Sequence, residues 1–318
     1  MTVVPTLTLK SGEKMPIIGL GTWQSKPGEV GQALKIALNN GYRHFDCAHV
    51  YMNQDEIGQV LEEAIAQGLV NREELFITSK IWNTFHSYEK AKEGVDIILQ
   101  QLKLKYIDLL LIHSPMGYQE GEEMFPWTED GSRMHFSDVD YLDTWKGLEE
   151  AVQAGKVKSI GLSNFNSQQI QRVIDHSHIQ PAVLQVELHP YFQQTKLVNF
   201  CKEKGIEVTA YSPLGSMTAP FRKEGQANLL EDPVILEIAK HHNKSPAQVA
   251  IRWSIQRGLI VIPKSTNEHR IKENFDVFGF ELSKDEMAKM AGIDRNWRIF
   301  DLAARNGDHK YFPYNDEF

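Results

Sequence analysis

Residues 76–113, FITSKIWNTFHSYEKAKEGVDIILQQLKLKYIDLLLIH, hold an apolar run, a stretch with helical periodicity and a second apolar run. The two runs, 76–80 and 107–113, have the length and apolar character of buried strands. The segment between them is long enough for a helix, which is the usual connection between two parallel strands. This stretch therefore predicts a β-α unit on a parallel sheet, with Lys80 and His113 where its two strands end.

The same alternation continues in both directions along the chain. The predicted strands are 17–21, 44–46, 76–80, 107–113, 157–163, 182–187, 207–211 and 260–262. Eight such strands predict an α/β fold, a (β/α)8 TIM barrel, and 318 residues suit a single domain over residues 1–318. Ahead of them, 6–9 and 14–17 flank Ser11-Gly12-Glu13, which predicts an N-terminal β-hairpin that closes one barrel end.

Capping signals predict where several helices begin. Asp232-Pro233 and Ser245-Pro246 each combine an N-cap residue with proline in the first turn. Ser283 with Glu286 forms a capping box for an additional helix near the end of the chain.

Three segments exceed the usual length of a loop between strand and helix: 114–138, 213–231 and 292–318. Their aromatic residues lead us to expect long active-site loops that wall a pocket. These residues are Phe125, Trp127, Phe136, Phe221, Trp297 and Phe300.

The composition argues against several classes of partner. The formal net charge is -8 and no block of lysine and arginine stands out, so we expect neither nucleic acid nor an anionic membrane surface. The N-terminal stretch MTVVPTLTLKSGEK has no signal-like apolar segment, and no run approaches the ~20 apolar residues of a membrane span. Cys47 and Cys201 lie in unrelated segments and predict reduced thiols. We therefore expect a cytoplasmic protein. Separately, we expect a monomer.

Four polar residues stand at or just beyond the C-terminal ends of predicted strands, the face on which barrel enzymes carry their active sites. They are Asp46, Tyr51, Lys80 and His113, in HFDCAHVY, FITSKIW and DLLLIHSP. A tyrosine has a pKa of about 10 and is a poor acid near neutrality unless a cation stabilises its phenolate and an imidazole offers a hydrogen bond. Lys80 and His113 would supply both, and Asp46 would keep Lys80 charged.

Three of the four also have a purely structural interpretation. Asp46 would cap a turn, Lys80 would be solvated, and His113, at the end of an apolar run, would be a core histidine with its hydrogen bonds satisfied. A buried lysine and aspartate both require partners, however, and these residues provide them for one another. The combination favours the catalytic interpretation.

Seven segments occur in one order along the chain: HFDCAHVY, FITSK, DLLLIHSP, KVKSIGLSNFN, LQVELHPY, AYSPLGS and IPKSTNEHRIKEN. In this order they resemble the aldo-keto reductases, and most closely the aldose-reductase-like branch. The likeness runs from Leu7 to the closing PYNDEF. It implies reduction of aldehydes and ketones to alcohols with NADPH, by hydride transfer with Tyr51 as general acid and without a metal.

Gly19-Leu20-Gly21 does not form a dinucleotide fingerprint, because Gln24 stands where the third glycine would fall. The segment after the eighth strand instead offers cations and hydroxyls at a helix start, where backbone N–H groups favour an anion; the alternative is a solvated basic helix start. The resemblance implies that it binds the 2′-phosphate of NADPH, with Glu273 and Asn274 at the adenine. The segment contributes Lys264, Ser265, Thr266, Asn267 and Arg270.

The resemblance assigns further residues to the cofactor. It implies that Ser163, Asn164 and Gln185 bind the nicotinamide carboxamide and that Tyr211 stacks under the ring, although Tyr211 also suits a core aromatic position. Pyrophosphate contacts are implied for Ser212, Leu214 and Ser216. Thr22 and Trp23 would border the ribose and the substrate.

As the partner we expect a small-molecule carbonyl substrate, in a pocket lined by Trp23, Trp82, Ser114, Phe125 and Phe300. Ser114 stands where the similar enzymes carry tryptophan, and Thr218 where they carry an acidic residue that helps to close over the cofactor. Both changes favour bulky apolar carbonyls, including steroid-like ketones. Barrels of this superfamily also resemble channel-associated subunits and lens crystallins, which bind nucleotide or serve structurally with little turnover; these are the alternative class.

Two histidine pairs resemble metal ligands, His241-His242 and His176-x-His178. Neither belongs to an H-E-x-x-H motif, and the sequence shows no carboxylate companion beside them. We therefore expect surface histidines and no metal.

Overall fold

A computed structural model describes residues 4–216, 219, 225, 227–316 and 318. Its main sheet has eight strands, each hydrogen-bonded in parallel to the next one along the chain. They are β3 (Leu20–Gly21), β4 (His44–Asp46), β5 (Phe76–Ile81), β6 (Ile107–Ile112), β7 (Val157–Ser163), β8 (Val183–Glu187), β9 (Glu207–Tyr211) and β10 (Ile260–Val261).

The first and last strands meet and close the sheet into a barrel. The N–H of Val261 donates to the carbonyl of Ile17 at 2.9 Å, and the N–H of Gly19 donates to the carbonyl of Val261 at 2.9 Å. Parallel bridges also join Ile18 to Val261 and Gly21 to Lys264. The predicted TIM barrel is therefore confirmed. The predicted strand 17–21 is shortened to β3, because residues 17–19 form only isolated contacts at the closure.

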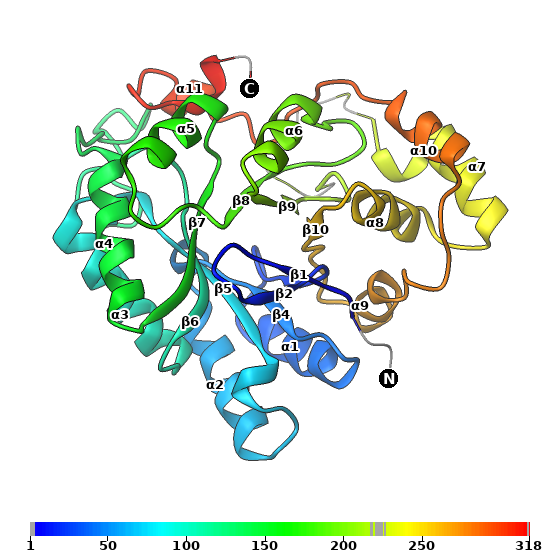
Figure 1. The fold of residues 1–318 in the computed structure, drawn as a ribbon, viewed down its shortest axis with the longest axis horizontal. Coiled ribbons are helices and arrows are strands. Elements are labelled where there is room, and N and C mark those ends of the chain that lie inside the picture. The colour runs from blue at the N-terminus through cyan, green and yellow to red at the C-terminus, as the bar shows by residue number, and fades with distance from the viewer. Residues whose placement is uncertain (1–3, 217–218, 220–224, 226, 317) are drawn as a thin grey trace.

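Helices surround the strands on all sides of the ring (Figure 1). They are α1 (Glu29–Asn39), α2 (Gln54–Ala66), α3 (Tyr88–Leu102), α4 (Tyr141–Gln153), α5 (Ser167–His176), α6 (Thr195–Glu203), α7 (Pro233–His242), α8 (Pro246–Gln256), α9 (Glu268–Phe275), α10 (Lys284–Ala291) and α11 (Ala303–Asn306). The side chains of Asp232, Ser245 and Ser283 cap α7, α8 and α10 as predicted. Within the described residues, no helix combines the length and apolarity needed to cross a membrane.

The predicted hairpin closes one end of the barrel. β1 (Thr6–Thr8) and β2 (Lys14–Pro16) pair antiparallel, and Figure 1 shows them in dark blue across the centre of the ring. Met15 is fully buried in a small apolar cluster with Phe76 and Ile260, which begin β5 and β10. The hairpin therefore covers the N-terminal ends of the strands, and the opposite end is left for chemistry.

Candidate active site

The ends of three neighbouring strands bring the four predicted catalytic residues together. Asp46 is the last residue of β4, Lys80 is the penultimate residue of β5, and His113 follows β6 directly. Tyr51 ends the short 3-10 helix η1 (His49–Tyr51), which follows β4. Because the strands are parallel and adjacent, their carboxyl ends meet at one edge of the barrel.

Lys80 is the centre of this group. Its Nζ donates to Asp46 Oδ2 at 2.8 Å, to the carbonyl of Cys47 at 2.8 Å and to Tyr51 Oη at 3.3 Å. The Lys80 and Asp46 side chains are 1% and 2% exposed. All three ammonium protons have acceptors, so the buried charge is fully satisfied.

The pKa directions describe a charged lysine beside a protonated tyrosine. Burial lowers the pKa of Lys80, but the attraction of Asp46 and Tyr51 outweighs it, so the pKa is raised overall. Burial raises the pKa of Tyr51 to about 12, while Lys80 acts in the opposite direction. The predicted effect of Lys80 on Tyr51 is therefore present, but the effect of burial is larger.

His113 stays neutral in this setting. Burial, and then the charge of Lys80, hold the pKa of His113 well below its usual value. Its ring lies edge-on to Tyr51, with centroids 5.9 Å apart, and edge-on to Trp82 at 5.2 Å. Nδ1 of His113 has no hydrogen-bond partner among the described residues. The imidazole is therefore held by packing and keeps hydrogen-bonding capacity in reserve.

Two residues expected at the cofactor instead hold Asp46 in this structure. Gln185 Nε2 donates to Asp46 Oδ1 at 2.8 Å, and Thr22 Oγ1 donates to the backbone carbonyl of Asp46 at 2.7 Å. Both side chains are buried. Gln185 fixes the carboxylate that orients Lys80 and Thr22 fixes the backbone of the same residue, roles that sequence reasoning missed.

Asn164 joins the ends of several strands to the C-terminal segment. Its Nδ2 donates to the carbonyl of His113 at 2.9 Å and to Ser163 Oγ at 3.2 Å. Its Oδ1 accepts from Tyr211 Oη at 2.9 Å and from Tyr314 Oη at 3.2 Å. The amide is saturated, so a bound carboxamide would have to replace one of these partners.

The residues expected at the pyrophosphate lie just after β9. Ser216 Oγ donates to Ser212 Oγ at 2.6 Å, and both residues have positive φ, 38° and 52°. Leu214, between them, is half-buried against the core. Thr218 and Phe221 lie outside the described residues.

The segment after β10 forms the start of α9. The Asn267 side chain caps the helix by accepting the N–H of Arg270 at 3.0 Å, and the N–H of Asn267 donates to Ser265 Oγ at 3.1 Å. Lys264 Nζ donates to the carbonyl of Gln24 at 3.0 Å. Burial is the main cause that lowers the pKa of Lys264, with Glu29 opposing and Arg270 adding to the decrease. Two cations therefore stand close together at a helix N-terminus.

Three other residues assigned to the cofactor complete this region. Thr266 and Glu273 are half-buried, and Asn274 is buried in α9.

Aromatic residues gather on two sides of the tetrad. On one side, Trp82 contacts Phe125 edge-on at 5.6 Å and donates its indole N–H to the carbonyl of Met124 at 2.6 Å. On the other, Phe300 lies edge-on to Trp23 and to Tyr211, in each case at 5.4 Å.

The remaining loop aromatics pack elsewhere in the described structure. Trp127 lines a surface cavity together with Glu120 and Glu123, and Arg305 lies over its ring. Phe136 packs on His309, and Trp297 packs on Tyr191. The long loops therefore send only part of their aromatic content toward the tetrad.

Ser114 is buried, and its hydroxyl is engaged. Its Oγ donates to Asn83 Oδ1 at 3.0 Å and accepts the N–H of Met116 at 3.3 Å. The residue therefore ties the start of the 114–138 loop to the short helix η3 (Asn83–Phe85).

Glu187, at the end of β8, is a functional residue that sequence reasoning missed. Its carboxylate is fully buried and accepts the N–H of Ile299 at 2.7 Å and that of Phe300 at 2.9 Å. His189 Nε2 lies 3.0 Å from the same carboxylate. Glu187 thus fixes the C-terminal segment that carries Phe300; its only sequence signal is a charged residue at a strand end.

The interpretation of His241-His242 as a pair without a carboxylate companion is wrong. Glu286 of α10 contacts both imidazoles, at 2.8 Å from His241 Nδ1 and 3.0 Å from His242 Nε2. The two helices are far apart in sequence, so no local pattern reveals the contact. Among the described residues, His176 and His178 belong to no comparable group.

Known proteins that are similar to this chain in sequence and in structure belong to one family. The model of the aldo/keto reductase family matches residues 17–295. Aldo-keto reductase family 1 member A1 of Mus musculus is 46% identical, over 98% of this chain and 99% of its own length. The aldose reductase of Schistosoma japonicum superposes with a TM-score of 0.92 at 46% identity, covering 98% of this chain and 99% of its own.

A second solved structure, the Bombyx mori aldo-keto reductase in complex with NADP, has a TM-score of 0.89 at 38% identity. It covers 98% of this chain and 100% of its own. The family model and the relatives thus span nearly the whole barrel. This chain belongs to the aldo/keto reductase family.

Proposed function

We propose that this protein reduces aldehydes and ketones to alcohols with NADPH, and that Tyr51 donates the proton to the carbonyl oxygen. As a member of the aldo/keto reductase family, the chain is an NADP-dependent oxidoreductase. One observation carries the assignment of the acid: Lys80 Nζ lies 3.3 Å from Tyr51 Oη and 2.8 Å from Asp46 Oδ2.

Lys80 stabilises the charge that appears when Tyr51 gives up its proton. With a pKa of about 12, Tyr51 is protonated at neutral pH and can donate. The phenolate that remains faces an ammonium already fixed by Asp46 and Cys47. Because these dipoles and charges are oriented before the reaction, the developing charge needs little reorganisation.

His113 contributes a neutral hydrogen-bonding ring beside the acid. Its depressed pKa keeps the imidazole uncharged, so it does not repel Lys80 and can still donate a hydrogen bond to the carbonyl oxygen. Tyr51 and His113 would thus hold the carbonyl oxygen between two donors, which orients the substrate and stabilises negative charge on oxygen.

The residues at the start of α9 fit a phosphorylated cofactor. Lys264 and Arg270 form no ion pair in the part of the chain that the structure describes, and the helix N-terminus adds backbone N–H groups. We assign the 2′-phosphate of NADPH to this segment, with Ser163, Asn164, Gln185 and Tyr211 around the nicotinamide. When bound, NADPH supplies the hydride that reaches the carbonyl carbon.

The aromatic residues beside the tetrad support apolar carbonyl substrates. Trp82 and Phe125 offer ring surface beside His113, and Trp23 and Phe300 offer it beside Tyr211, which suits aromatic or polycyclic compounds. We propose that bulky apolar aldehydes and ketones, including steroid-like ketones, are preferred to sugars. A cytosolic location and a monomeric state stay predictions.

The proposal is tested by following NADPH absorbance while the protein is mixed with a panel of aromatic aldehydes, sugars and steroid ketones. Multiple turnovers with the apolar carbonyls support it. Tight NADPH binding without turnover of any carbonyl would instead favour a nucleotide-binding module.

A further inference from the structure

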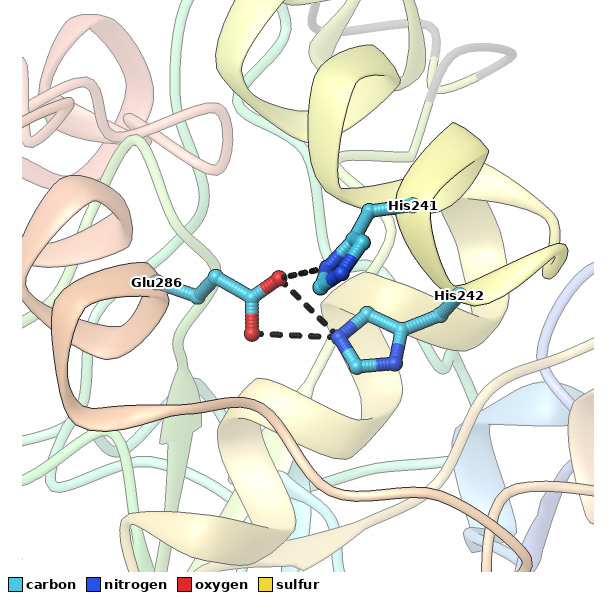
Figure 2. A group of neighbouring side chains, drawn as sticks. All are labelled: His241, His242 and Glu286. Atoms are coloured by element: carbon cyan, nitrogen blue, oxygen red, sulfur yellow. Dashed lines mark hydrogen bonds and ion pairs between the residues drawn. The ribbon is translucent and has the colours of Figure 1, made fainter.

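His241 and His242, the last two residues of α7, point toward Glu286 of α10 on the outside of the barrel (Figure 2). Their ligand atoms and a carboxylate oxygen all lie within 4.8 Å of one another. His241 Nδ1 is 2.8 Å from Glu286 Oε1, and His242 Nε2 is 3.0 Å from each carboxylate oxygen. We propose that these three residues bind a divalent transition-metal ion of the Zn²⁺ type.

The convergence of the two histidines is unusual for neighbours on a helix. Successive residues of an α-helix point about 100° apart, so adjacent rings ordinarily diverge. Here they meet because His241 presents Nδ1 and His242 presents Nε2 to the same carboxylate (Figure 2). The ring of His242 also packs on Phe280 at 5.4 Å, which limits its rotation.

Glu286 is held in place by groups other than the histidines. Its Oε2 accepts the N–H of Ser283 at 2.7 Å as part of the capping box of α10. A ligating carboxylate is commonly oriented by such an outer hydrogen bond.

The donor set selects the class of metal. Two imidazoles and one carboxylate suit Zn²⁺ and its first-row neighbours, whereas Mg²⁺ and Ca²⁺ require mostly oxygen ligands. An ion at about 2.0–2.1 Å from each ligand keeps its donors roughly 3–4 Å apart, so small side-chain rotations complete the geometry. His241 is 73% exposed, which gives the ion access from solvent.

A bound ion would fasten α10 to α7. The same two helices are already linked by the ion pair of Lys289 with Glu237, at 2.7 Å. α10 leads into the C-terminal segment that carries Phe300, so the clamp would stabilise the entry to that segment. A ligand that binds only the folded state raises the unfolding temperature.

Calorimetric titration of chelator-treated full-length protein with ZnCl₂ tests the site, with MgCl₂ as the comparison ion. We expect one Zn²⁺ bound per chain, no Mg²⁺ binding, and a higher unfolding temperature with Zn²⁺. His242→Gln should weaken Zn²⁺ binding by roughly tenfold or more. His241→Gln should weaken Zn²⁺ binding to a similar degree, and because His241 is exposed the variant should still fold. Circular dichroism of the metal-free variant checks its folding.

The matched control is the double substitution His176→Gln with His178→Gln, which removes the other histidine pair and should leave Zn²⁺ binding unchanged. Two results overturn the proposal. One is the lack of Zn²⁺ binding by the unaltered protein. The other is binding that His241→Gln and His242→Gln leave unchanged, because the ion would then lie elsewhere.

Discussion

At the residue scale, the candidate site depends on the burial of a charged pair. Removing an ion from water costs several kcal/mol, and a buried pair offsets this cost only when its remaining donors and acceptors are satisfied. Lys80 uses all three protons, while Asp46 also accepts from Gln185. Loss of either partner would leave a buried charge, so substitutions of Lys80 or Asp46 affect folding and chemistry together.

Ser114 allows a test of substrate size at a single residue. We expect Ser114→Trp to lower kcat/KM for bulky ketones by at least about tenfold, or about 1.4 kcal/mol, because an indole would occupy space near His113. Small aromatic aldehydes should change little. Steady-state kinetics on both substrate classes measure the ratio.

Ser114→Ala is the matched control, because it keeps the space and removes only the hydroxyl, with its hydrogen bonds to Asn83 and to the N–H of Met116. It should leave the preference for bulky ketones in place. A uniform loss for all substrates in Ser114→Trp would indicate a displaced His113 and would contradict the pocket-size explanation.

At the element scale, the starts of helices and the ends of strands position the site. The N-terminus of α9 brings Lys264 and Arg270 together, and the end of β8 brings Glu187 to the C-terminal segment. Neither arrangement depends on a loop alone. The barrel ends therefore position both the proposed cofactor residues and the proposed substrate residues.

We predict that Lys264 and Arg270 determine a preference for NADPH over NADH. Replacing both by alanine should weaken NADPH binding selectively, because charge-assisted hydrogen bonds to a phosphate are strong and NADH lacks that phosphate. Fluorescence titration with both cofactors measures the change. Lys272→Ala is the control: it removes an exposed ion pair with Glu268 on the same helix and should not change cofactor preference. Equal losses of affinity for NADPH and NADH in the double variant would show that Lys264 and Arg270 do not bind the 2′-phosphate.

A second prediction at this scale concerns Glu187. Glu187→Gln replaces one acceptor oxygen by an N–H₂ group, which cannot accept, so one of the two N–H groups of Ile299 and Phe300 loses its acceptor. We expect faster tryptic cleavage within 292–318 and a higher KM for apolar carbonyls. The control is Glu281→Gln, which changes an exposed carboxylate that pairs with the buried Arg252. Unchanged cleavage in Glu187→Gln would show that the carboxylate does not hold the segment.

At the scale of the whole molecule, buried neutral histidines tie stability to pH. Burial lowers the pKa of His44 to about 4 and that of His86 to about 3, and both side chains are fully buried. In the unfolded chain a histidine titrates near 6.5, so the unfolded state binds protons first as the pH falls. Stability is therefore present above about pH 6.5 and is lost as the pH falls toward these lowered values.

We predict that the free energy of unfolding falls between about pH 6.5 and 5, by up to about 1.4 kcal/mol per pH unit for each of the two histidines. Neither ring nitrogen of His86 has a hydrogen-bond partner among the described residues, so His86→Met should cost little at neutral pH and reduce this slope. Urea unfolding at several pH values measures the slope of the free energy of unfolding against pH. The control is His176→Gln, which changes an exposed histidine and should keep the slope of the unaltered protein. The prediction is contradicted if His86→Met shows the same slope as this control.

The sequence predicts the parts of this fold that have local signals. Strands such as 157–163 and the caps at Asp232, Ser245 and Ser283 follow from patterns a few residues long. Contacts between distant segments leave no such pattern, so the roles of Glu187 and Gln185 and the pairing of Glu286 with His241 emerge only in three dimensions. The edge-on packing of Phe136 on His309 was likewise out of reach.

The central claim is that Tyr51 protonates the carbonyl oxygen with the support of Lys80. The most direct test is the turnover rate of Tyr51→Phe at saturating carbonyl and NADPH, with NADPH binding measured on the same sample. The control is Tyr106→Phe, because Tyr106 precedes β6 at the opposite end of the barrel. We predict a loss of roughly a hundredfold to ten-thousandfold with cofactor binding near normal. A rate above about a tenth of that of the unaltered protein would contradict the claim, because general-acid catalysis of this size does not survive removal of the acid.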